Sequence, residues 1–235
     1  MNILLHKEGG TNEMGFICST VGRKILMAVT GLLLVLFLCI HFFGNSLIYF
    51  GLINAYGEKL HSLPILVWVS RIGMIILLAI HIFFGIKLTL ENWAARPQAY
   101  AVKKETRATV ASKTMIWTGL AVALFLIYHL LHFTVRVTNP EISSGIDALG
   151  RADVFKMITL SFKNILISGA YIAALIALGL HIYHGVQSLV QTFGLNSDKS
   201  LPCVENAGRG IAILLFLGYV SIPVAIIVGL LSFKG

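Results

Sequence analysis

Histidines are the residues of this chain whose spacing indicates chemistry. A twelve-residue stretch occurs twice: TGLLLVLFLCIH covers residues 30–41 and TGLAVALFLIYH covers residues 118–129, with seven identical positions. Both stretches end in a histidine ten residues after the glycine, which matches His41 with His129. The contexts IHIFFG and LHIYHG likewise match His81 with His181. Four histidines therefore occupy equivalent places in two similar halves, and a longer connecting segment in the second half accounts for its wider spacing.

The matched histidines fall at two depths along their predicted helices. With a helical rise of 1.5 Å per residue, His41 and His129 lie roughly 25 Å from the basic residues before their helices. His81 and His181 lie on helices that run in the opposite direction, roughly 9 to 12 Å from the C-terminal ends of those helices. A haem iron takes one axial imidazole from each side, so two pairs at two depths predict two bis-histidine haem b groups in a four-helix bundle. No C-x-x-C-H motif is present, so both haems are expected to be non-covalent. A zinc site fits poorly, because no carboxylate or thiolate joins either pair.

Two further histidines have no counterpart in the other half. His132 aligns with Gly44, and His184 aligns with Phe84. The repeat therefore favours the matched histidines as iron ligands. We expect His132 and His184 to contact a haem propionate or to handle protons, and an inert polar contact explains them equally well.

Five further residues are candidates for a role in a functional site. Gly85 and Gly185 follow the second matched pair by four residues, where a missing side chain would let a porphyrin, or simply another helix, approach the backbone. Arg71 stands inside an apolar run, where it either extends to the membrane surface or pairs with an anion such as a propionate. Glu58 and His61 lie in a polar segment that is expected to be a solvated loop.

The elements that must position these residues are membrane helices. The chain of 235 residues is 57% hydrophobic and 12% charged, with a mean hydropathy of +0.86, whereas soluble domains contain about a quarter charged residues. Five apolar runs approach the ~20 residues that cross a bilayer, and none alternates like a barrel strand. The first run is too long for a cleavable signal and is expected to be retained. We therefore predict an all-α polytopic protein with a single integral-membrane domain, residues 1–235, and helices at about 22–51, 64–90, 113–137, 162–191 and 208–233.

Basic residues predict the orientation. If the N-terminus is cytoplasmic, eleven of the eighteen Lys and Arg residues lie on the inner side, most of them in the segment 87–113. The net charge of +8 thus has a topological explanation. Nucleic acid is not an expected partner, because the charge is divided among helix ends instead of forming one face. Segment 87–112 is long enough to form a docking surface.

These histidine contexts, including LHIYHGVQSLVQTFG at 180–194, resemble the cytochrome b membrane anchor of succinate:quinone oxidoreductases, in its single-chain, five-helix, two-haem bacterial type. The resemblance covers nearly the whole chain. It implies that His81 and His181 hold a proximal haem near the cytoplasm and that His41 and His129 hold a distal one. It further implies a bacterial cytoplasmic (inner) membrane, a flavoprotein subunit and an iron–sulfur subunit docked on the cytoplasmic side, and electron exchange with menaquinone or another quinone. The dicarboxylate chemistry of such an enzyme lies in the partner subunits.

The chain departs from the family at two places. Some members use a carboxylate in the first outer loop for quinol oxidation, and Glu58, with His61 beside it, is near that place but at a different spacing from the histidine. Gly179 stands where a relative has a glutamate in a proton path, so that path is not expected here. Two rivals remain: a cytochrome b subunit of a hydrogenase or formate dehydrogenase, and a histidine-lined transporter with paired halves.

Overall fold

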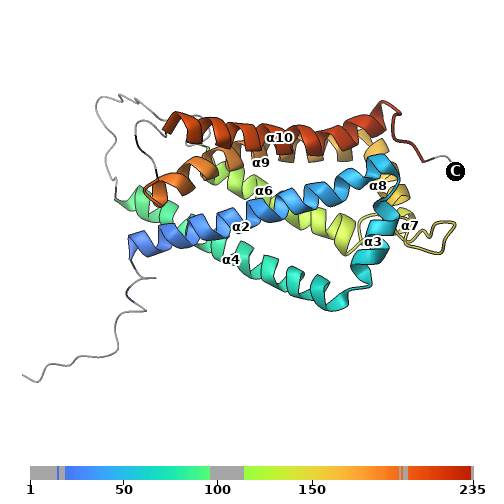
Figure 1. Ribbon diagram of the computed structural model, residues 1–235, viewed down its shortest axis with the longest axis horizontal. Coiled ribbons are helices and arrows are strands. Elements are labelled where there is room, and N and C mark those ends of the chain that lie inside the picture. Colours follow the sequence, from blue (N-terminus) through green and yellow to red (C-terminus); the bar gives the residue numbers. More distant parts are fainter. Residues whose placement is uncertain (1–14, 16–18, 96–113, 196, 198–200, 234–235) are drawn as a thin grey trace, which may run out of the picture.

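Five long helices run side by side along the length of the molecule (Figure 1). The computed structural model describes residues 15, 19–95, 114–195, 197 and 201–233. The long helices are α2 (Thr20–Ser46), α4 (Pro64–Ala94), α6 (Met115–His129), α9 (Ile165–Thr192) and α10 (Leu201–Ile227). A 3-10 turn, η1 (Leu47–Phe50), extends α2, and a π-helical turn, η2 (Leu130–Thr134), extends α6. Each of the five is long and apolar enough to span a membrane, and the described part of the chain contains no β-strand, which confirms the predicted all-α membrane fold.

Predicted and observed helix bounds agree closely for the first four spans and differ for the fifth. The apolar pattern predicts the last helix at 208–233, whereas α10 runs from Leu201 to Ile227. Its first three turns contain the polar residues Glu205, Asn206 and Arg209, so hydropathy marks where the chain enters the membrane and not where the helix begins. The helix ends before Gly229, whose φ of 81° lies in the left-handed region that favours glycine.

Side chains and proline define where the membrane helices begin. Ser19 caps α2 by accepting a hydrogen bond from the backbone N–H of Gly22 at 2.9 Å. Asn164 caps α9 in the same way, accepting from the N–H of Leu166 at 3.0 Å. Pro64 occupies the first turn of α4, where its missing N–H has no helical partner to lose.

The five helices pack unevenly. α2 lies against α4, α9 and α10, α9 also packs against α6 and α10, and α4 contributes no buried residue. Large apolar side chains such as Ile65, Ile75 and Leu124 are instead exposed along the outside of the bundle. This apolar surface suits contact with lipid. Lipid hydrocarbon offers no hydrogen bonds to backbone groups, and a helix forms those bonds internally.

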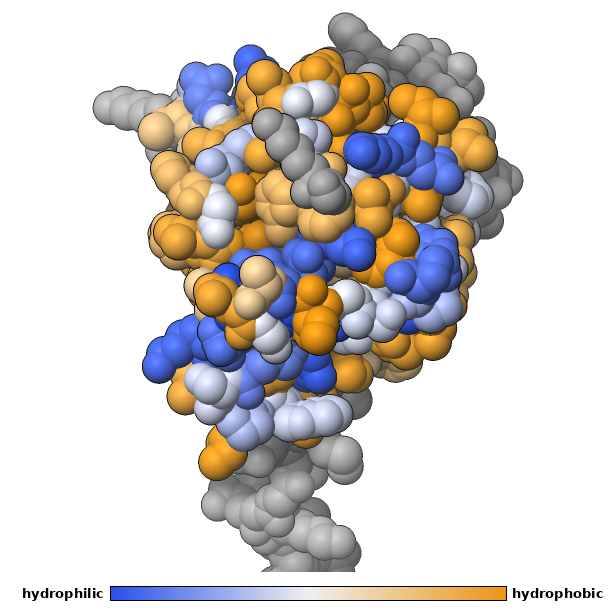
Figure 2. Space-filling view, turned by 90° about the vertical axis from the view of Figure 1, so that its right-hand side faces the viewer, coloured by the Kyte–Doolittle hydropathy of each residue, from blue (hydrophilic) through white to orange (hydrophobic). Residues whose placement is uncertain are grey.

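Three short helices cover one end of the bundle, which we call the capped end: α3 (Ile53–His61), α7 (Pro140–Ser143) and α8 (Val154–Lys163). The opposite end, where α2 begins, we call the N-side. The polar segment that contains Glu58 and His61 was expected to be a loop, which is wrong, because it forms the helix α3. The connection between α6 and α9 contains α8, which is partly core: Met157, Ile158 and Phe162 are buried. Figure 2 looks onto the capped end and shows hydrophilic side chains across it, among hydrophobic ones.

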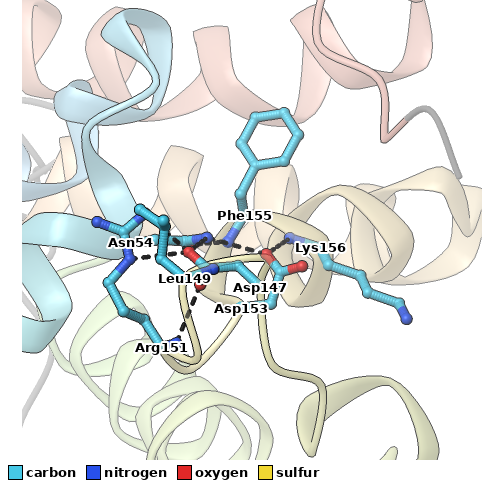
Figure 3. Close-up of polar contacts among 7 residues, drawn as sticks. All are labelled: Asn54, Asp147, Leu149, Arg151, Asp153, Phe155 and Lys156. Atoms are coloured by element: carbon cyan, nitrogen blue, oxygen red, sulfur yellow. Dashed lines mark hydrogen bonds and ion pairs between the residues drawn. The ribbon is translucent and has the colours of Figure 1, made fainter.

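A polar network centred on Asn54 joins α3 to the segment before α8 (Figure 3). The Asn54 amide Nδ2 donates to Asp147 Oδ2 at 3.2 Å and to Asp153 Oδ1 at 3.1 Å, and its Oδ1 accepts from the backbone N–H of Phe155 at 2.8 Å. The Arg151 guanidinium donates to Asp147 Oδ2 at 2.9 Å. This contact lowers the pKa of Asp147 to about 2. Asp153 in turn caps α8, so one network fixes both short helices.

At the N-side, an ion pair joins the start of α2 to the end of α4. Arg23 Nη2 lies 2.9 Å from Glu91 Oε2, and Arg23 is buried. The expected docking segment, 87–112, lies in part outside the described residues, since 96–113 are not among them. The ion pair therefore lies in the described part of that segment, at the end of α4.

Candidate functional site

The four matched histidines form two pairs inside the bundle. His41 of α2 faces His129 of α6, with ring centres 6.0 Å apart and planes at 90°. His81 of α4 faces His181 of α9, with ring centres 6.2 Å apart and planes at 69°. We call the first the cap-side pair and the second the N-side pair. The structure thus brings together the two pairs that the repeat and the depth estimate proposed, and each pair joins one half of the chain to the other.

Both separations match the space that one haem iron needs between two axial imidazoles. A bond of about 2 Å from a first-row metal to each imidazole nitrogen, plus the radius of each ring, gives roughly 6 Å between ring centres. The surroundings are apolar and aromatic: Phe37 stacks on His41 at 5.5 Å, and Phe125 lies 5.9 Å from His129. Neutral nitrogen donors in such surroundings suit a haem iron, so the residues present fit this cofactor.

The N-side pair is held by the first two residues of each repeat. Thr30 Oγ1 lies 3.1 Å from His81 Nδ1, and Thr118 Oγ1 lies 3.4 Å from His181 Nδ1. A Cβ atom added at Gly31 would lie only 3.2 Å from His81 Cε1, and one added at Gly119 only 3.0 Å from His181 Cε1. Reasoning from sequence used these Thr-Gly dipeptides only to align the halves and missed their contact with histidine. The presence of the same Thr-Gly dipeptide at the start of both repeats was the sequence signal that could have indicated this contact.

The cap-side pair has different neighbours. Asn45 Nδ2 lies 3.3 Å from His41 Nε2, so binding of a metal at this nitrogen requires the Asn45 amide to move aside. The Tyr171 hydroxyl lies 3.4 Å from His129 Nδ1. Tyr219 of α10 contacts this region as well, with its ring centre 6.1 Å from that of His41.

His132 lies in the π-helical turn η2 and is fully enclosed. Its exposed fraction is 2%, and both ring nitrogens have protein partners: Nδ1 lies 2.9 Å from the Tyr171 hydroxyl, and Nε2 lies 3.0 Å from Ser161 Oγ. These contacts agree with the polar-contact interpretation, and a role toward a propionate or in proton handling stays a prediction. Gly44, its counterpart in the first half, lies beneath Tyr56 of α3, where an added Cβ would come within 2.8 Å of the tyrosine ring.

His184 and the two glycines of the His-x-x-x-Gly motif lie in looser surroundings. His184 is half-buried, and its Nδ1 has no hydrogen-bond partner among the described residues. A Cβ at Gly85 would make an ordinary contact of 3.5 Å with Met27, and one at Gly185 would meet no described atom within 4 Å. Close helix packing therefore does not explain Gly185, and the porphyrin hypothesis for both glycines stays a prediction.

The remaining predicted residues lie apart from the two pairs. Arg71 is half-buried on α4 with its guanidinium 5.3 Å from the ring centre of exposed Trp68. Glu58 and His61 are both exposed on α3 at the capped end, and His61 Nδ1 lies 2.8 Å from the carbonyl oxygen of Gly57. Their exposure agrees with a solvated surface, and their roles toward a quinone or a propionate stay predictions.

Among the residues that the structure describes, no group of three or more His, Cys, Asp or Glu side chains is arranged to hold a metal ion. Cys39 and Cys203 are free thiols. Comparisons with protein family models, with curated proteins and with solved structures found no match to this chain.

Proposed function

We propose that this chain is a cytochrome b that carries electrons through a membrane on two non-covalent haem b groups. The observation that supports the proposal is the presence of two histidine pairs, at two levels of one bundle, with ring centres 6.0 and 6.2 Å apart. His41 and His129 would hold one haem, and His81 and His181 the other. When bound, haem supplies a carrier that accepts and releases one electron at a time.

The protein's own contribution is to hold the ligands and exclude water. Helices supply their own backbone hydrogen bonds, so the imidazoles can stand in an apolar interior without a competing polar backbone. The side chains of Thr30, Thr118 and Tyr171 orient three of the four rings from outside the pairs. The pairs follow one another along the bundle, as a route from one membrane face to the other requires.

In its finer form, the proposal follows the sequence resemblance. The chain would be the quinone-reactive anchor of a succinate dehydrogenase or fumarate reductase in a bacterial cytoplasmic membrane, with its N-terminus in the cytoplasm. A flavoprotein and an iron–sulfur subunit would bind the N-side, and menaquinone or another quinone would exchange electrons with the haems. Glu58 and His61, exposed at the capped end, are the candidates for proton exchange with that quinone.

Haem quantification of histidine variants tests the assignment. The purified wild-type protein is expected to show a b-type band in its reduced-minus-oxidised spectrum and two haems per chain. His41→Ala and His81→Ala should each lose one haem, whereas His132→Ala and His184→Ala should retain both. Absence of a b-type band in the wild type would contradict the cytochrome assignment and favour a transporter.

The partner subunits test the finer form. Purification of the native complex should yield a covalent-flavin subunit that reduces fumarate. A nickel or molybdenum partner would instead identify a hydrogenase or formate dehydrogenase and contradict the succinate assignment, while leaving the two-haem assignment in place.

A further inference from the structure

Two buried threonines occupy equivalent places in the two halves of the chain. Thr30 is 4% exposed and Thr118 is 8% exposed. They occupy the first position of the two repeats, and each lies against the N-side histidine of its own half. A buried hydroxyl needs partners, and the partners show where the hydroxyl hydrogen lies.

The hydroxyl of Thr30 must donate to the backbone. Its oxygen lies 2.7 Å from the carbonyl oxygen of Leu26 and 3.2 Å from that of Met27. Carbonyl oxygens only accept, and a threonine hydroxyl has a single hydrogen to donate. Toward His81 the hydroxyl therefore presents a lone pair, so the hydrogen in the 3.1 Å contact belongs to His81 Nδ1.

Thr118 has the same arrangement in the second half. Its hydroxyl oxygen lies 3.1 Å from the carbonyl oxygen of Thr114 and 3.0 Å from that of Met115. The hydroxyl hydrogen is again directed to the backbone, and His181 Nδ1, at 3.4 Å, is again the donor. A neutral imidazole that carries its hydrogen on Nδ1 leaves the lone pair on Nε2.

From this geometry we infer that Thr30 and Thr118 are positioning residues that select the Nδ1–H tautomer of His81 and His181 and so direct Nε2 to a metal between them. Gly31 and Gly119 also contribute, since a Cβ atom at these positions would press on Cε1, the carbon between Nδ1 and Nε2, at 3.2 and 3.0 Å. The inference rests on the proposed two-haem function and names the residues that prepare one of its two sites. Residues that orient a ligand's second nitrogen affect metal affinity as well as ligand basicity.

The cap-side pair has other partners in place of a threonine hydroxyl. His41 contacts Asn45 through Nε2, and His129 is approached by Tyr171. Loss of a threonine should therefore affect one of the two haems and leave the other unchanged, which separates a positioning role from general damage to the fold.

Thr30→Val and Thr118→Val test the inference, because valine keeps the shape and removes the hydroxyl. Haem content by pyridine haemochromogen assay and haem potentials by spectroscopic redox titration are the measurements. In each variant, one of the two haems is expected to bind about 10- to 100-fold more weakly. Where it is retained, its potential should rise, because an imidazole without its hydrogen-bond acceptor is a weaker donor to ferric iron. Thr30→Ser should restore wild-type behaviour.

Thr89→Val is the matched control. Thr89 lies on α4, and its hydroxyl donates to the carbonyl oxygen of Gly85 at 2.8 Å, so it makes the same backbone bond as Thr30. This variant should keep both haems and both potentials. If the wild type holds two haems while Thr30→Val and Thr118→Val match Thr89→Val, the inference is wrong and the proposed function stands. A wild type without haem would overturn both.

Discussion

At the scale of single residues, the histidines of this chain differ in how many ring nitrogens the protein itself engages. His81 and His181 each use Nδ1 for a threonine hydroxyl, which leaves Nε2 for another partner. His132 uses both nitrogens, one for Tyr171 and one for Ser161. An imidazole with two protein partners has no lone pair to spare for iron. Burial alone therefore does not identify a ligand, because the most deeply buried of these three is the one that the protein satisfies completely.

His132→Leu should destabilise the protein without removing a haem. The change leaves the buried hydroxyls of Tyr171 and Ser161 without this partner and should lower the free energy of unfolding by about 2 to 4 kcal/mol. Thermal or denaturant unfolding of the purified protein in detergent measures the loss. His184→Leu is the comparison, since His184 Nδ1 has no partner in the described part of the chain, and it should cost less. An equal loss in both variants would show that the hydrogen bonds of His132 contribute little.

At the scale of elements, the short helices of the capped end act as one structural unit. Asn54 holds α3 to Asp147 and Asp153, and Asp153 begins α8, whose buried side chains then pack on the bundle. Tyr56 of the same α3 rests on Gly44 of α2. The cap is therefore linked to the helix that carries His41, and its order should help to fix the end of α2.

Acid should weaken the cap through Asp147. Its pKa of about 2 in the folded protein lies below the ordinary 3.8, chiefly because Arg151 donates to the carboxylate. Stabilisation from this contact is present above about pH 4 and is lost as the pH falls through about 2. Thermal unfolding in detergent should show a smaller decrease between these pH values in Asp147→Asn, which lacks the charge throughout, than in the wild type.

Glu141→Gln is the control for that measurement. Glu141 is exposed on α7, and its side chain makes no hydrogen bond to another described residue. Its variant should follow the wild-type pH dependence. If Asp147→Asn and Glu141→Gln give the same curve as the wild type, the contact with Arg151 does not stabilise the cap.

At the scale of the whole molecule, the proposed orientation can be tested from both ends. Leu149 is 74% exposed at the capped end, and Cys203 is exposed near the start of α10, toward the N-side. In a background with Cys18 and Cys39 changed to serine, a membrane-impermeant maleimide should label Leu149→Cys in intact spheroplasts. Cys203 should react only after the membrane is opened. The reverse pattern would place the N-terminus outside.

Much of the helical framework was predictable from composition, because a long apolar run has few alternatives to a membrane helix. The matched histidines were predictable because a repeat places equivalent residues at equivalent depths. The contacts of His132 were not, since Tyr171 and Ser161 come from two other helices and nothing in their local sequence marks them. The α3 helix was missed because its polar residues resemble a loop, while the packing of Ile53 and Tyr56 determines its structure.

The four paired histidines form their side-chain hydrogen bonds with residues of their own half of the chain, whereas each pair joins the two halves. Thr30 and Asn45 serve the first half, and Thr118 and Tyr171 serve the second. A duplicated ancestor would have carried the contact between threonine and histidine in each copy from the start. A substitution near either histidine of a pair could then change the properties of that ligand alone. The potential of each haem would therefore depend on two sets of residues that can vary independently.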